Sequence, residues 1–471
     1  MEVKTTFWVK LSYIYILLPI IIFFIGYCNL ITAILGCSVV LVSAYYLFKN
    51  APALWKPQKK VEWILLATVF IISLIWVYSS GIGALVFQNS DHNCRNPIFE
   101  LLVSQPWPVT APDGQSILTY YIGFWFVPAV IGKLFNSVAI GYYAQIAWAT
   151  IGVFFVFYYL FASLKKKNLM PIFIFIFFSG LDIIGYYIFR GIPTIMSHKE
   201  WWCPYQFSSM TTQLYWVFNQ ALPAWLLTLV LYHQKNNKNI VFLYTTLFIS
   251  STLPAIGIFP FVCYFLLKNG VDCGAILSKK HILNAIKSAI TFENISSVLG
   301  IFFISYLYLS ANISGGVSSV RIPNLWSVMF VYLPFVFLEA GIYMLAIFRK
   351  FKKEPLWYIA LACFMVYPVI YIGTSNDFCM RATIPALIIL VVMFLQALED
   401  EEIRNKKLLY FIMLLAFFVG TLTPLSEISR TVIMTQHGYT KIESKLGFEN
   451  FFGYVEGNKF LQYFGKQLPK N

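Results

Sequence analysis

Charge is scarce in this chain. Only 11% of its 471 residues are Asp, Glu, Lys or Arg, whereas soluble domains carry about 25%. By contrast, 59% are hydrophobic and 19% are aromatic. This composition excludes a soluble enzyme, a disordered chain and a fibrous repeat. The apolar runs do not alternate with polar residues, which argues against a transmembrane barrel. The sequence therefore predicts an all-α polytopic membrane protein.

Several motifs of known chemistry are missing. There is no GxxxxGK[ST] and no GxGxxG after a strand, which argues against an ATP-driven pump. No HExxH is present, which argues against a zincin-type protease. The eight cysteines form no CxxC pair, so a zinc site is not expected. Cys94 and Cys203 lie in polar loops placed on the same side, where a disulfide is one interpretation and free thiols are favoured.

What the chain has is a series of long apolar runs. The first, Val9 to Tyr27, is long enough to span and has no small-residue cleavage site, so we expect an anchor rather than a removable signal. The runs lie at 9–27, 30–48, 61–87, 116–135, 139–161, 169–190, 214–232, 239–253, 255–267, 295–311, 326–347, 356–373, 382–398 and 408–425. The short runs 239–253 and 255–267 meet at Pro254 and predict a Pro-broken hairpin or two half-helices.

Lys and Arg predict which side each loop faces, because short cytoplasmic loops are rich in both. The net charge of +14 is accordingly interpreted as orientation and not as nucleic-acid binding. If every run spans the membrane, Lys165 to Lys167 and all later basic clusters lie on the outer side. If one run between Phe87 and Lys165 does not span, most basic residues lie on the cytoplasmic side instead. The run 116–135, with Pro128 and its Tyr, Trp and Lys residues, suits an interfacial helix. We therefore expect about 13 transmembrane helices and a cytoplasmic N-terminus. The alternative is that 116–135 spans and the charge bias fails.

With this topology, the ionisable groups that do not set orientation collect outside. They fall in four pieces: 88–115, 190–213, 312–325 and 373–381. Asp182 lies in the outer half of its span, where a carboxyl group indicates either a functional site or an ion pair with a cation such as Arg190 or Lys133. Glu339 is expected nearer the cytoplasmic side, away from these groups, with a structural role.

A chemistry that needs no nucleotide fits this arrangement, namely sugar transfer from a polyprenyl-phosphate donor. It requires a carboxylate that deprotonates or orients the acceptor hydroxyl. It also requires Arg or Lys to hold the phosphate that leaves.

The layout resembles the GT-C class of integral membrane glycosyltransferases. In that class a span leads into a first outer loop that carries a catalytic carboxylate, followed by interfacial helices and a returning span. Here the span 61–87 leads to Asp91, and the stretch from Leu118 to Phe135, ending in Gly-Lys-Leu-Phe, is similar to the interfacial segment of such enzymes. The resemblance covers about residues 61–200. The chain departs from the class in two ways. It has two extra spans before the first outer loop, and it has Asp91-His92 where the class usually has a pair of acidic residues.

The resemblance implies roles for individual residues. Asp91 matches the catalytic carboxylate and is expected to act as general base, with His92 or Glu100 as alternatives. Arg381 is expected to hold phosphate, with Asp377 as its partner. The weaker candidates for the substrate or its phosphate are Lys133, Asp182, Arg190 and Arg321. No cofactor is expected, although Asp91 with a second carboxylate could hold a divalent metal ion.

These features divide the chain into four parts. We expect two N-terminal transmembrane helices in 1–60, a GT-C-like core in 61–235 with its first outer loop at 88–138, further spans in 236–425 and an extracytoplasmic tail in 426–471. The expected location is the bilayer of a bacterial plasma membrane, with the active site outside. The expected partners are a polyprenyl-phosphate-linked sugar and a glycan or lipid acceptor, and no nucleic acid. A transporter or flippase, or a polymerase, of lipid-linked saccharides is the competing interpretation, and a purely structural membrane protein is the fallback.

Overall fold

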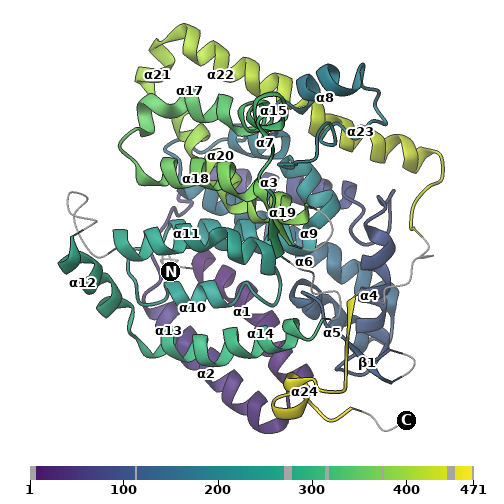
Figure 1. Ribbon diagram of the computed structural model, residues 1–471. Helices are drawn as coiled ribbons and strands as arrows, with labels where there is room; N and C mark the ends of the chain where they lie inside the picture. Colours follow the sequence, from purple (N-terminus) through teal and green to yellow (C-terminus); the bar gives the residue numbers. More distant parts are fainter. Residues whose placement is uncertain are drawn as a thin grey trace.

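The computed structural model describes residues 7–111, 114–269, 278–312, 318–372, 376–442 and 451–468. Within these residues, ten helices are long and apolar enough to cross a membrane. They are α1 (Phe7–Tyr27), α2 (Leu30–Lys49), α3 (Lys60–Ser79), α6 (Val138–Ala162), α7 and α8 (Met170–Phe177, Asp182–Arg190), α9 (Met210–Tyr232), α13 to α14 (Phe292–Ser297, Phe303–Ser310), α15 to α17 (Leu325–Ser327, Leu333–Val336, Ile342–Phe351), α19 and α20 (Asp377–Ala382, Ile384–Leu398), and α22 and α23 (Lys407–Gly420, Leu422–Gln436). The fold is thus that of an all-α polytopic membrane protein (Figure 1).

Shorter elements connect these helices. The other helices are α4 (His92–Ser104), α5 (Phe126–Leu134), α10 (Ile240–Thr245), α11 (Thr252–Lys268), α12 (Lys279–Ala289), α18 (Pro355–Val366), α21 (Glu401–Asn405) and α24 (Lys459–Tyr463), with 3₁₀ turns η1 (Gly123–Trp125) and η5 (Tyr367–Val369) and π-helical turns η2 (Val298–Phe302), η3 (Val328–Tyr332) and η4 (Phe337–Gly341). In the described part of the chain, two small antiparallel sheets pair β1 (Ser116–Leu118) with β4 (Phe452–Tyr454) and β2 (Ser318–Val320) with β3 (Ile370–Ile372).

The long helices begin where the sequence supplies a capping side chain. Asn29 accepts a hydrogen bond from the Thr32 N–H at the start of α2, and Ser209 accepts one from the Thr212 N–H at the start of α9. Such caps satisfy backbone donors that the first turn leaves unpaired. Almost every residue of α9 and α20 is buried, whereas α2 and α3 turn most of their side chains outward. The core therefore lies around α9 and α20, with a lipid-type apolar surface at the periphery.

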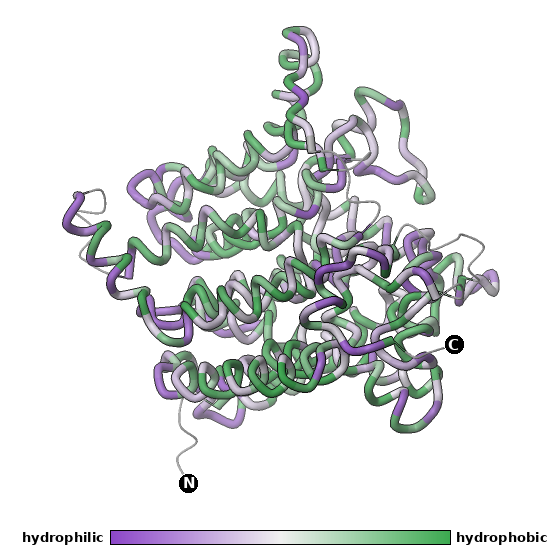
Figure 2. Tube along the Cα trace, turned by 60° about the horizontal axis from the view of Figure 1, so that its bottom comes forward, coloured by the Kyte–Doolittle hydropathy of each residue, from purple (hydrophilic) through white to green (hydrophobic). Residues whose placement is uncertain are grey.

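The basic loops gather at one end of the helices. The backbone N–H groups of Lys165 and Lys166 both donate to the Glu399 carboxylate at 2.8 Å, and Lys350 pairs with Asp400. Figure 2 shows apolar helices running side by side between two ends where hydrophilic residues collect. We call the end with these loops the basic end. The opposite end holds a polar cavity, and we call it the cavity end.

The run 116–135 does not form a helix of spanning length. It contains β1, η1 and the nine-residue α5 instead. The Gly123 N–H donates to the Ile249 carbonyl at 3.0 Å, beyond the end of α10. Pairing of β1 with β4 brings the C-terminal tail onto the first loop of the cavity end. The sequence predicted that the last span ends at 425 and that the tail begins at 426. The helical region of α22 and α23 instead continues to Gln436, so the first residues of the expected tail belong to it.

The short runs 239–253 and 255–267, which meet at Pro254, do not form two helices of spanning length. The six-residue α10 is too short to cross a bilayer, and α11 has 17 residues. The Ser251 hydroxyl donates to the Gln220 carbonyl, near the middle of α9. The turn between α10 and α11 therefore lies among the helices, with a short helix before it and a much longer one after it. The expected total of 13 spans compares with the ten helices of spanning length in the described residues.

Candidate functional site

A polar cavity of about 240 Å³ lies at the cavity end. It is formed by residues from the start of α4, the loop 191–209, α9, α19 and α23. Its lining is Ser90, Asp91, His198, Lys199, Glu200, Trp201, Gln206, Thr212, Trp216, Asp377, Met380, Arg381 and Glu427. Four carboxyl groups and two cationic side chains thus converge from segments far apart in the sequence.

Asp91 stands at the N-terminal cap position of α4 and pairs with Arg95 one turn later. Its Oδ2 lies 2.8 Å from Arg95 Nη2, and the Arg95 side chain is only 2% exposed. Burial acts to raise the pKa of Asp91, but the charges of Arg95 and Arg381 outweigh it and lower the pKa from its ordinary value. Asp91 is therefore an anion throughout the neutral range.

Arg381 lies opposite, on α19. Its Nη2 lies 3.2 Å from Asp377 Oδ2, and its Nη1 donates to the Tyr121 hydroxyl at 3.0 Å. The Nε of Arg381 and the Nε and Nη1 of Arg95 are buried and have no hydrogen-bond partner among the described residues. Arg381 lines the cavity and Arg95 pairs with Asp91 of the lining, so two guanidinium groups with unused N–H donors stand close to a site that suits an anion such as phosphate.

Glu200 enters from the loop 191–209. Its Oε1 accepts the Ser209 N–H at 2.9 Å, and its Oε2 accepts the Gln206 side-chain amide at 2.7 Å. Burial and the neighbouring Asp182 charge raise the pKa of Glu200 to about 8, although the hydrogen bonds act in the opposite direction. The cavity thus contains two carboxyl groups whose pKa values shift in opposite directions.

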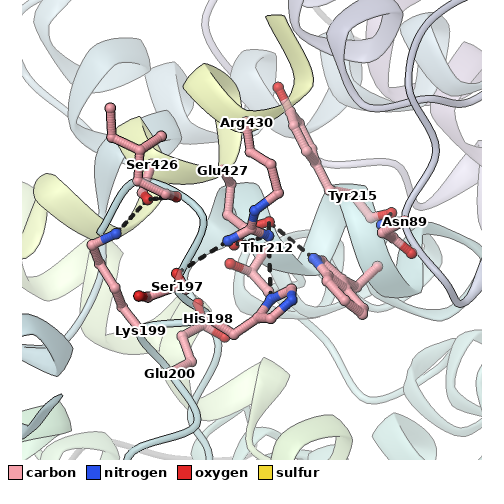
Figure 3. A network of polar contacts seen from close by, with 12 residues as sticks. Asn89, Ser197, His198, Lys199, Glu200, Thr212, Tyr215, Ser426, Glu427 and Arg430 are labelled. Carbon is pink, nitrogen blue, oxygen red and sulfur yellow. Dashed lines mark hydrogen bonds and ion pairs between the residues drawn. The ribbon is translucent and has the colours of Figure 1, made fainter. Parts of the chain in front are cut away.

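Polar side chains of α23 and of the loop 191–209 form a network beside the cavity (Figure 3). Arg430 Nη1 lies 2.9 Å from Glu427 Oε1 and 3.2 Å from His198 Nδ1. The Trp216 indole N–H donates to Glu427 Oε2 at 3.0 Å, and Lys199 contacts the Ser426 hydroxyl. Burial, followed by the Arg430 and Lys199 charges, lowers the pKa of His198 to about 4. His198 is therefore neutral, and its Nδ1 accepts the hydrogen bond from Arg430.

Three of the residues expected from the sequence line this cavity, namely Asp91, Asp377 and Arg381. His92 is adjacent but buried under the Phe218 ring, and burial together with the Arg95 charge lowers its pKa to about 3. It is therefore a neutral packing residue rather than part of the lining.

The other expected residues lie outside the cavity lining. Glu100 accepts from the Tyr142 hydroxyl and pairs with Lys441 at 2.7 Å. Lys133 donates to the Gln105 carbonyl. Arg190 is exposed at the end of α8, and Arg321 stacks on the Tyr371 ring at 4.3 Å.

The structure differs from what was expected for Asp182 and for Glu339. Asp182 makes no ion pair with Arg190 or Lys133 in the described structure. Glu339 does not lie apart from the polar groups, because its carboxyl group is within hydrogen-bonding reach of Asp182 and accepts from Trp202 of the loop 191–209. The physical reason is that the loop folds back between the helices, so that Trp202 is 2% exposed.

Sequence reasoning did not select His198, Lys199, Glu200, Glu427 or Arg430 as site residues. Glu427 and Arg430 follow a long apolar run at a spacing of three, which places them on one helix face only if the helix continues beyond 425. Among the described residues, no three His, Cys, Asp or Glu side chains group in a way that could hold a metal ion. Cys94 and Cys203 are both free thiols.

Comparison with known proteins gives no assignment. No protein-family model matches the chain, and neither a curated protein nor a solved structure matches it significantly. A functional assignment therefore rests on the geometry and electrostatics of the cavity.

Proposed function

We propose that the protein is a membrane glycosyltransferase that moves a sugar from a polyprenyl-phosphate donor to a glycan or lipid acceptor in the polar cavity. The observation that carries the proposal is the position of Asp91 in the cavity lining, where it pairs with Arg95 and where the charge of Arg381, also in the lining, acts on it. An acceptor-activating anion and a phosphate-binding pair are the two elements that this transfer requires.

In the proposed reaction, the acceptor hydroxyl oxygen attacks the anomeric carbon as the carbon–oxygen bond to phosphate breaks. Asp91 accepts the hydroxyl proton, and the polyprenyl phosphate leaves with the bonding electron pair towards Arg381 and Arg95. Because a single displacement is involved, the anomeric configuration inverts. The donor and acceptor are proposed to be lipid-anchored or envelope molecules on the extracytoplasmic side of a bacterial plasma membrane.

The surroundings of the cavity support a lipid-linked substrate. The loop that supplies His198, Lys199 and Glu200 also exposes Ile192, Ile195 and Met196. Apolar side chains exposed beside a polar cavity suit an interface between the headgroup region and hydrocarbon. A donor with a sugar phosphate on a polyprenyl chain has the same division between polar and apolar parts.

The test is lipid mass spectrometry on cells that lack the protein, complemented with wild type, Asp91→Asn or Arg321→Gln. A polyprenyl-phosphate sugar should accumulate in the deleted strain and persist with Asp91→Asn at normal protein level. Arg321→Gln, which lies outside the cavity lining, should restore the wild-type profile. A wild-type profile with Asp91→Asn would contradict the assignment of the base.

A specific observation favours one alternative, a transporter of lipid-linked saccharides. The span Met170–Arg190 is interrupted between α7 and α8, and Asp182 begins the second half. Discontinuous helices with charged groups deep in the membrane are typical of secondary transporters. An assay of the purified protein separates the two functions, because transport alone predicts no transferase activity with a polyprenyl-phosphate sugar and an acceptor.

A further inference from the structure

The break between α7 and α8 brings two acidic side chains together in the interior. Asp182 is the first residue of α8, and Glu339 lies in the π-helical turn η4 of a neighbouring span. Both side chains are 1% exposed. The Leu181 N–H donates to the Leu338 carbonyl at 3.0 Å, so the two spans are joined by their backbones beside the two carboxyl groups.

The hydrogen bonds around the pair lack one donor. Asp182 Oδ2 accepts from the Ser179 hydroxyl at 2.8 Å, and Glu339 Oε1 accepts from the Trp202 indole N–H at 3.1 Å. Glu339 Oε2 is buried, has no hydrogen-bond partner among the described residues and lies against Gly180, two residues before Asp182. The Asp182 and Glu339 carboxyl groups interact directly, and the Thr423 hydroxyl of α23 interacts with Asp182 as well. Two carboxylates are both acceptors, so a bond between them requires a proton on one.

No cation of the described residues compensates the pair. None of their Lys, Arg or His side chains lies within ion-pair distance of either carboxyl group. The titratable groups that interact with the pair electrostatically are themselves acids: Glu200 from the loop 191–209, Tyr343 from α17, Cys203 from the same loop and Cys379 from α19. Two buried like charges with no cation cannot both persist in a low-dielectric interior.

We propose that Asp182 and Glu339 form a proton-binding site within the membrane-spanning region, which holds one proton between the two carboxyl groups and joins the broken span to its neighbour. The proton supplies the missing donor for Glu339 Oε2. Trp202, which bonds to Glu339, belongs to the same loop 191–209 that supplies Glu200 to the cavity lining. The site is separate from the proposed transfer reaction and does not depend on it.

The test is infrared spectroscopy of the purified protein in liposomes. Wild type should give a carboxylic-acid carbonyl band that shifts in D₂O and persists at alkaline pH, where Glu200 and the exposed carboxyl groups have ionised. The Asp182→Asn/Glu339→Gln double variant should lose this band. Its side-chain amides retain hydrogen-bond donors and acceptors at both positions. Glu402→Gln, at an exposed position near the basic end, should keep the band.

Each contrary result overturns the proposal. Absence of the alkaline-resistant band in wild type would mean that the pair is ionised, and this conclusion does not depend on whether the double variant folds. The same band in the double variant would assign the proton to another residue. A band that disappears when sodium replaces choline in the buffer would mean that a metal cation occupies the site instead.

Discussion

Asp91 and Glu200 face the same cavity but have opposite proton affinities. The lowered pKa of Asp91 follows from two guanidinium groups, and the raised pKa of Glu200, about 8, follows from burial and a neighbouring carboxyl group. A general base must be deprotonated, so its activity rises as pH rises through its pKa. The pH dependence therefore separates the two residues.

The first prediction concerns this profile. With Asp91 as base, initial rates of sugar transfer in membranes should be constant through the neutral range and fall only in acid, as pH drops towards the lowered pKa. Glu200→Gln should leave the shape unchanged. A rate that climbs up to about pH 8 in wild type and loses that rise in Glu200→Gln would instead assign the base to Glu200.

The second prediction concerns Arg381. Arg381→Gln removes a charge from the expected position of the leaving phosphate, and loss of one such donor lowers rates by about a hundredfold. Arg381→Lys should recover part of the loss, because the charge returns without the planar set of donors. Rates are compared at equal protein level, with Arg321→Gln as the matched control. Equal rates in Arg381→Gln and the control would remove Arg381 from the mechanism.

At the scale of elements, hydropathy located the span 169–190 but not its interruption. The run contains two apolar stretches, Phe173 to Phe178 and Ile183 to Phe189. Their hydropathy fits one continuous helix as well as it fits two separate ones. The Ser179-Gly180 pair is a local kink signal, but hydropathy does not register it. What fixes the break is the close approach of Gly180 to Glu339 and the bond from Leu181 to Leu338, both far away in the sequence. The same limit applies to α23, whose polar residues become site residues only because the helix continues past 425.

The third prediction concerns Gly180. A Cβ atom at this position would lie 2.0 Å from Glu339 Oε2 and 2.6 Å from Glu339 Cα. Because the second contact is with backbone, Gly180→Ala should force the two spans apart and lower stability by about 1–3 kcal/mol. Thermal unfolding in detergent measures the change. Gly300→Ala is the control, since a Cβ there meets nothing within 4 Å. Equal unfolding temperatures for the two variants would contradict the close approach.

At the scale of the molecule, composition was sufficient to predict a polytopic helical membrane protein. The sequence placed Asp91, Asp377 and Arg381 at the outer ends of helices, and in the structure all three line one cavity. The loop 191–209 was recognised as polar, but its inward fold, with Glu200 and Trp202 both buried, was not predictable because it depends on tertiary contacts. Orientation across the bilayer rests on charge, since the basic loops share one end.

The fourth prediction tests that orientation. Lys166 is exposed at the basic end, and Glu456, just after β4, is exposed at the cavity end. In intact cells, a membrane-impermeant maleimide should label Glu456→Cys and not Lys166→Cys, and both should react once the membrane is permeabilised. The unsubstituted protein controls for the native thiols. The opposite labelling would place the cavity in the cytoplasm. A sugar donor would then have to reach Arg381 from the inner leaflet, and the charge bias would have to arise from something other than orientation.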